Sequence, residues 1–256
     1  MLPNVKQRLE RCTSLPSVPA LAMKVLELCQ KEDLNFAEIA RTISTDPALA
    51  TKVLRMANSP VMGLRNPAKT VSHALALLGI NAVRTLALSF SLVSDLRGKD
   101  KANGYKQYWK RSITAGIAAQ ELASSIKLPH AEEAFLSSLL QDIGMLALAQ
   151  GMPDVYPEII VQAAGDHRKL IEGERAELGC DHADVGQWLL TRWKLPGALS
   201  QIVGASHGDF SSCTDPESRQ FASVVALSGL VADIWVSGDA GSATELAQAQ
   251  AEALLG

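Results

Sequence analysis

Helix-start and helix-stop signals divide almost the whole chain into short amphipathic segments. Asn35 followed by Glu38 forms a capping-box pattern, which satisfies free backbone N–H groups at a helix start. Asp46 before Pro47 marks a second start, because proline at the first helical position loses no hydrogen bond. Apolar residues then recur at helical spacing: Leu49, Val53, Met56 and Ala57. No strand-period run of useful length is present, so the sequence predicts an all-α protein.

One polar stretch divides this helical pattern into two predicted lobes. Residues 97–104 contain two glycines and have little apolar surface to bury. We therefore expect two packed helical lobes, at residues 1–98 and 104–238. Residues 239–256 are expected to form a C-terminal helix or a linker, either an ordinary last helix or a segment cut from a longer chain. Beyond the two starts described above, helices are predicted at 70–78, 82–96, 105–126, 131–149, 156–166, 183–193, 197–207 and 216–236.

The composition excludes several classes of function. With 24 Lys and Arg against 27 Asp and Glu, the formal net charge of -3 gives no electrostatic case for binding nucleic acid or anionic lipid. The most apolar stretch, 222–236, is too short for a bilayer, and no secretory signal is visible. Widely spaced cysteines indicate reduced thiols: Cys12, Cys29, Cys180 and Cys213. We expect a soluble cytoplasmic protein.

Several short motifs, taken in order, resemble one family. The first lobe contains LPSVP at 15–19, DPALA at 46–50, LRMANS at 54–59 and VSHALALLG at 71–79. The second contains QDIG at 141–144, ELGCDH at 177–182, VG at 185–186, WLL at 188–190 and WKLP at 193–196. Together these resemble the HDOD (HD-related output) domain of bacterial signalling proteins over about residues 15–236. That family is similar to the HD phosphohydrolases and HD-GYP phosphodiesterases, and the second lobe resembles a degenerate HD-type helical bundle.

The resemblance implies a metal site that has lost half of its ligands. In the HD enzymes, His and Asp side chains hold metals, and a metal-bound water attacks phosphorus. Carried over to this chain, Arg111 and Gln141 stand at the two histidine positions, and Asp142 and Asp233 at the two carboxylate positions. A guanidinium has only donors and a permanent positive charge, so it repels a metal. We therefore expect no metal and no other cofactor.

Two further histidines match positions of the HD-GYP enzymes. His182 and His207 fall where those enzymes have extra histidines, but Ser206 replaces the first of a His-His pair and no Gly-Tyr-Pro segment follows. Either histidine is explained equally by an ordinary structural role, as a hydrogen-bonded core residue or at a helix end. The remaining histidines have no spacing that suggests chemistry: His73, His130 and His167.

Electrostatics suggests why the two aspartates persist without a metal. Two buried carboxylates would repel each other, and each would raise the pKa of the other. Arg111 could supply the missing positive charge through a bidentate bridge to Asp142 or Asp233. We hypothesise that Arg111 replaces the metal as the electrostatic centre of the second lobe.

The function that these residues favour is non-catalytic. The resemblance implies a bacterial signal-transduction module whose partners are signalling proteins, such as receiver or diguanylate cyclase domains. The alternative is a residual metal-dependent phosphohydrolase or cyclic-dinucleotide phosphodiesterase, and a third reading is a sensor that binds a small molecule without turnover. Charge argues against nucleic acid, and the sequence predicts no oligomeric state.

Overall fold

The computed structural model describes residues 1–16, 19–31, 33–58, 67–99, 106–129, 131–236 and 240–255. Across these ranges the chain forms 14 helices and no strand, which confirms the all-α fold class. Parts of the motifs at 15–19 and 54–59, His130, and most of the predicted boundary at 98–104 lie outside the described residues. The chain divides into two compact units, one of Ser17–Ala102 and one of Met1–Pro16 with Asn103–Gly256.

Two helices of the smaller unit begin at the caps that the sequence predicts, whereas its first helix was not predicted. It contains α2 (Ala20–Cys29), α3 (Phe36–Ser44), α4 (Pro47–Ala57) and α5 (Val71–Lys99). The Asn35 side chain accepts a hydrogen bond from the backbone N–H of Glu38, and Asp46 accepts from those of Ala48 and Leu49. Gly79 interrupts α5 with φ 78°, a left-handed conformation that glycine adopts without strain. Apolar faces of all four helices form the core of this unit.

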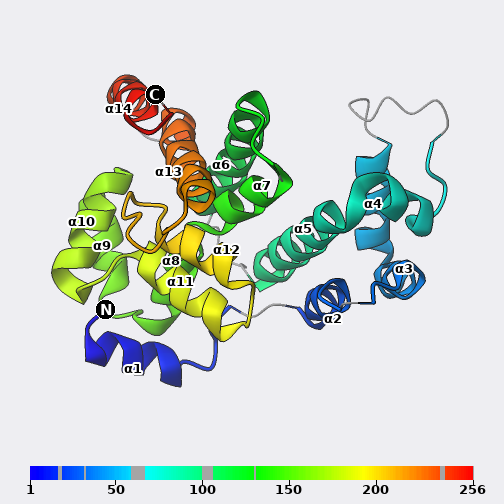
Figure 1. The fold of residues 1–256 in the computed structure, drawn as a ribbon. Coiled ribbons are helices and arrows are strands. Elements are labelled where there is room, and N and C mark those ends of the chain that lie inside the picture. The colour runs from blue at the N-terminus through cyan, green and yellow to red at the C-terminus, as the bar shows by residue number, and fades with distance from the viewer. Residues whose placement is uncertain are drawn as a thin grey trace. The chain divides into compact units, whose positions relative to one another are not determined.

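The larger unit contains ten helices among the described residues (Figure 1). They are α1 (Pro3–Arg11), α6 (Lys106–Ser125), α7 (Ala131–Leu140), α8 (Ile143–Gly151), α9 (Tyr156–Ala163), α10 (His167–Leu178), α11 (His182–Arg192), α12 (Gly197–Gly204), α13 (Pro216–Val236) and α14 (Ala240–Leu255). Helix α6 packs against α7 and α13, α8 packs against α11, and α14 packs along α13. Helix α1 also belongs here, since Val5 and Leu9 are buried and Leu2 N–H bonds to the Leu178 carbonyl.

Helix α1 was not predicted from the sequence, and two further elements of the larger unit differ from the prediction. The helix predicted over 131–149 is broken at Gln141 and Asp142, so that Asp142 becomes the N-cap residue of α8. Helix α10 was not predicted, because it is rich in charged residues and has too few apolar residues to show a helical period. Its ends are nevertheless marked: the Asp166 side chain caps the first turn, and Gly179 ends the helix at φ 63°. Both differences bear directly on the site described below.

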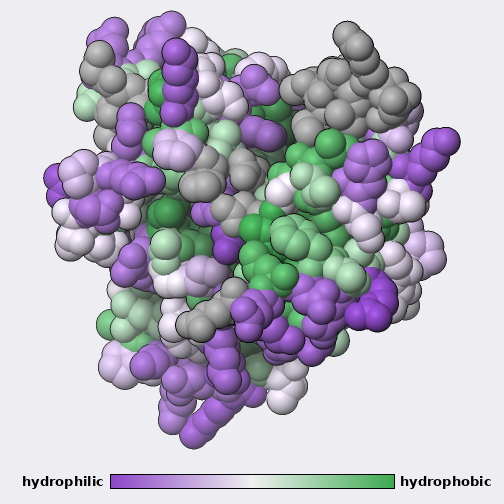
Figure 2. All heavy atoms as spheres, turned by 45° about the vertical axis from the view of Figure 1, so that its right-hand side comes forward, coloured by the Kyte–Doolittle hydropathy of each residue, from purple (hydrophilic) through white to green (hydrophobic). Residues whose placement is uncertain are grey.

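The apolar helices of the described chain are mainly core helices. By length and composition, α13 could cross a membrane, and the two bent parts of α5 pass the same test only as one broken span. Within the most apolar window of α13, 56% of the residues are buried inside the protein, which is weak evidence for a span. On the face shown in Figure 2, hydrophobic side chains lie among hydrophilic ones.

A glycine contact holds α8 and α11 together. A Cβ atom on Gly144 would lie 2.0 Å from the carbonyl oxygen of His182 and 2.7 Å from the backbone nitrogen of Gly186. Such distances are far below van der Waals contact, and both neighbours are backbone atoms that cannot rotate away. The absence of a side chain at Gly144 therefore allows the first turns of α8 and α11 to touch, which brings Asp142 close to His182.

We expect Gly144→Ala to destabilise the larger unit by about 3 kcal/mol or more, because its Cβ forces two helices apart. Urea unfolding followed by circular dichroism measures the change. Gly197→Ala is the matched control, since a Cβ there meets nothing within 4 Å and should change stability by no more than about 1 kcal/mol. Equal stabilities for the two variants would contradict this account of the packing.

Candidate functional site

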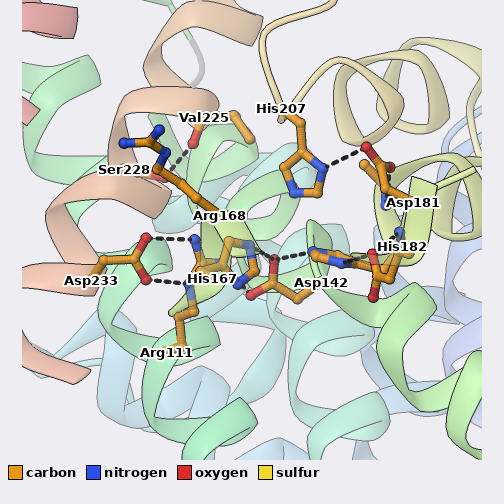
Figure 3. A network of polar contacts seen from close by, with 12 residues as sticks. Arg111, Asp142, His167, Arg168, Asp181, His182, His207, Val225, Ser228 and Asp233 are labelled. Carbon is orange, nitrogen blue, oxygen red and sulfur yellow. Dashed lines mark hydrogen bonds and ion pairs between the residues drawn. The ribbon is translucent and has the colours of Figure 1, made fainter. Parts of the chain in front are cut away.

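The predicted site residues converge inside the larger unit, and each comes from a different part of the chain (Figure 3). Arg111 lies on α6 and Asp233 on α13, while Gln141 and Asp142 occupy the break between α7 and α8. His182 is the first residue of α11, and His207 follows the end of α12. That these positions hold no metal stays a prediction.

Arg111 bridges both aspartates. Its Nε donates to Asp233 Oδ1 at 2.7 Å and its Nη2 to Asp233 Oδ2 at 3.3 Å, while Nη1 donates to Asp142 Oδ2. Arg111 is 7% exposed and Asp142 is fully buried. The predicted ion pair is therefore confirmed, and it involves both carboxylates instead of one.

A second glycine leaves room for this bridge. A Cβ on Gly229 of α13 would lie 3.0 Å from Arg111 Nη2 and 2.9 Å from Gln141 Oε1. Gln141 is also buried, and its Nε2 atom has no hydrogen-bond partner among the described residues. Arg111 and Gln141, which stand at the two positions that the resemblance assigns to histidine, thus share one small space beside Gly229 of α13.

The bridge fixes the charges of its members. Burial disfavours the charged form of Arg111, but the carboxylates of Asp142 and Asp233 outweigh it and raise the pKa of the guanidinium. For Asp142, burial acts to raise the pKa, yet Arg111 and the neighbouring histidines lower it well below its ordinary value. Both groups are therefore ionised at neutral pH.

Three imidazole rings converge on the other side of Asp142. The rings of His182 and His207 have centroids 4.5 Å apart, and His167 lies 4.8 Å from His182 and 5.6 Å from His207. One ligand atom from each histidine and one carboxylate oxygen of Asp142 lie within 4.8 Å of one another. The sequence prediction missed His167, because it sits at the start of the unpredicted helix α10. Asp166, which caps the start of α10, was the sequence signal that could have indicated this helix.

His182 is held by a buried carboxylate that the sequence prediction also missed. Glu174 Oε2 accepts from the Nδ1 of His182 at 2.7 Å and from its backbone N–H at 2.9 Å. The Tyr156 hydroxyl donates to the other oxygen of Glu174 at 2.6 Å. Burial lowers the pKa of His182, but Glu174 and Asp142 together raise it to about 10. Its Nε2 atom faces Asp142 Oδ1 at 3.5 Å.

His207 has a carboxylate of its own. Its Nδ1 lies 3.1 Å from Asp181 Oδ2, and Arg175 donates to that same oxygen at 2.9 Å from Nε. Asp181 also caps α11, so its position is fixed by the start of that helix. Burial lowers the pKa of His207, and it lowers that of His167 well below the ordinary value, with the charge of Arg111 adding to the effect. These two imidazoles are therefore neutral.

We expect Arg111→Ala to destabilise the larger unit by about 3–5 kcal/mol, because it leaves two aspartates facing each other without a cation. Thermal and urea unfolding measure this loss. Arg168→Ala serves as the control, since Arg168 is exposed on α10 and should change stability by only about 0.5 kcal/mol. Unchanged unfolding of the Arg111 variant would rule out the bridge as a source of stability.

Solved structures and a family model place this geometry in context. Among the solved structures, an HDOD domain protein of unknown function from Geobacter sulfurreducens is 19% identical, with a TM-score of 0.72 over 93% of this chain and 79% of that one. The MmoQ response regulator from Methylococcus capsulatus is 35% identical, with a TM-score of 0.51 over 94% and 93% of the two chains. A protein provisionally named a phosphohydrolase, from Shewanella amazonensis, is 24% identical, with a TM-score of 0.70 over 98% and 94%.

A curated relative and the family model complete the comparison. An uncharacterised protein of Treponema pallidum is 22% identical over 205 residues, and this chain spans 38% of its length. The family model for the HDOD domain matches residues 15–208, most of the chain. The resemblance seen in the short motifs is thereby confirmed, and the chain belongs to the HDOD family.

Proposed function

We propose that this chain is a non-catalytic regulatory module, which acts by binding a protein or a small ligand and not by hydrolysis. The observation that carries the proposal is the bridge from Arg111 to Asp142 and Asp233. A guanidinium held between the two carboxylates has the place and the charge that a catalytic metal would need.

The residues at the HD position do not fit a metal. Of the four positions that the resemblance assigns, one holds a cation, one holds the neutral amide of Gln141, and the two carboxylates are bonded to Arg111. A divalent ion there would have to displace Arg111 into a buried space without another partner. We therefore derive no hydrolytic step through this position.

The comparisons supply the regulatory setting of the proposal. MmoQ is named a response regulator, and a fold neighbour from Shewanella amazonensis carries a phosphohydrolase name instead. MmoQ has the higher sequence identity of the two, 35% against 24%, and this supports the regulatory function over hydrolysis. In that setting, we infer a cytoplasmic protein whose partners are signalling proteins such as receiver or diguanylate cyclase domains.

One observation favours the alternative of a residual phosphohydrolase. The cluster of Asp142 with His167, His182 and His207 offers four donor atoms of the kinds that transition metals bind. A metal bound there with an open position could activate water. The assay below separates this alternative from the main proposal.

We expect the protein to release no product from bis(p-nitrophenyl) phosphate or from cyclic diguanylate, with manganese, iron or zinc added, beyond the release in protein-free buffer. The reason is that Arg111 occupies one of the two positions at which the HD enzymes have a metal-binding histidine, and its positive charge repels a metal. Asp142→Asn is the matched control, and its progress curve should overlay that of the wild type. Metal-dependent turnover that Asp142→Asn abolishes would overturn the proposal in favour of the phosphohydrolase.

A binding module should also leave its ligand intact. We expect any nucleotide that raises the melting temperature of the protein to be recovered unchanged by mass spectrometry, because ligand binding to the folded state stabilises it without chemistry. Consumption of that nucleotide would argue for the enzyme.

A further inference from the structure

We propose that Asp142, His167, His182 and His207 form a closed four-ligand site for a divalent metal of the zinc type, separate from the HD position and sharing only Asp142 with it. The expectation of no metal rested on Arg111 and Gln141 and did not include His167. This site needs neither of the lost histidine positions. It lies on the side of Asp142 away from Arg111, because Arg111 bonds Oδ2 while the imidazoles face Oδ1.

The distances fit one small ion. Asp142 Oδ1 lies 3.5 Å from His182 Nε2 and 3.9 Å from His167 Nε2, and all four donor atoms lie within 4.8 Å of one another. Metal–ligand bonds of about 2.0–2.2 Å in tetrahedral geometry separate the donors by roughly 3.3–3.6 Å. Small side-chain rotations are therefore enough to close the set around a metal.

Hydrogen bonding leaves these same atoms unsatisfied. In the part of the chain that the structure describes, no hydrogen-bond partner exists for Asp142 Oδ1 or for the Nε2 atoms of His167, His182 and His207. Buried polar atoms are costly when left unpaired, so a group of them facing one point needs an explanation. A proton on His182 would satisfy that ring and Asp142, but it would leave His167 and His207 unexplained.

Two of the histidines already have the outer partners typical of metal ligands. Glu174 accepts from Nδ1 of His182, so that Nε2 is the ring nitrogen directed at the cluster. Asp181 faces Nδ1 of His207 in the same way at 3.1 Å, and Arg175 holds Asp181 in place. Carboxylates behind imidazoles orient the rings and increase their basicity toward a metal.

The surrounding charge favours a dication. Two guanidinium groups, those of Arg111 and Arg175, face four carboxylates. Counted with all three imidazoles deprotonated, which is the form that binds a metal, this network carries a formal charge of two minus four, or -2. The four carboxylates are those of Asp142, Glu174, Asp181 and Asp233. A divalent cation neutralises the network.

The donor set and its burial indicate the class of metal and its role. Three imidazoles and one carboxylate suit zinc, cobalt or nickel better than magnesium or calcium, which prefer oxygen ligands. The side chains of Asp142 and His182 are 0% exposed, and those of His207 and His167 are 8% and 10% exposed. Four protein ligands leave no position for a reactive water, as in structural zinc sites. The metal would tie together α8, α10, α11 and the segment after α12.

Two pockets border the cluster at His167. A pocket of about 470 Å³ is lined by residues that include Asp166, His167 and Asp233, together with part of α14. A second pocket, of about 170 Å³, also reaches His167 and Arg111. Solvent therefore reaches the edge of the cluster at His167, at the start of α10.

The test is metal binding by the whole chain after chelator treatment and dialysis. We expect titration calorimetry to show one equivalent of Zn²⁺ per chain, a rise in melting temperature, and a visible ligand-field band when Co²⁺ is the probe. His167→Gln and His207→Gln should each abolish stoichiometric binding, and both lie at the partly exposed edge of the cluster, where folding is least at risk. Glu174→Gln should weaken Zn²⁺ binding by about 10–100-fold.

His73→Gln is the matched control, because His73 is an exposed histidine on α5 and its loss should leave Zn²⁺ binding unchanged. Circular dichroism establishes that each variant is folded before titration. Folded wild-type protein that takes up neither Zn²⁺ nor Co²⁺ would overturn the proposal, and so would full binding by both His167→Gln and His207→Gln. Because these readouts need no turnover, failure here is distinguishable from failure of the proposed function.

Discussion

The buried ion pair between Arg111 and its two aspartates is the interaction on which the larger unit depends. It connects the middle of the chain, at α6, to the start of α8 and to the end of α13, so it joins segments that are distant in sequence. Removing either kind of partner leaves an uncompensated charge in the core, which is far more costly than the net value of the pair. The glycine at 229 leaves room for the guanidinium, and packing and charge are therefore fixed together.

Asp142 connects the ion pair of Arg111 to the cluster of histidines. One of its oxygens bonds to Arg111 and the other faces His182, while its backbone begins α8. The contact of Gly144 with α11 sets the distance between Asp142 and His182. Beyond His182, the carboxylate of Glu174 extends the network into α10. The position of each polar group is thus determined by a helix start or by a close helix contact.

Sequence patterns predicted the fold class, the caps at Asn35 and Asp46, and the bridge from Arg111. They did not predict the break at residues 141–142, because the apolar pattern continues through it and only tertiary packing interrupts the helix. Nor did they predict α10, where apolar residues are too few to show a period. Missing that helix meant missing His167 and Glu174, whose proximity to His182 depends on how α10 and α11 fold back on each other. Charge and chemistry were readable from sequence, while proximity was not.

The two proposals are compatible because Arg111 divides the site. Its guanidinium bonds to Asp142 Oδ2 and to both oxygens of Asp233, so that Asp142 Oδ1 is the one oxygen of this pair left to face the imidazoles. A cation is therefore confined to the imidazole side, where the four ligands come from the protein. On that side, the carboxylates of Glu174 and Asp181 contact Nδ1 of His182 and of His207 and orient the two rings. Both proposals thus rest on the same residue, the arginine at a position where the HD enzymes have histidine.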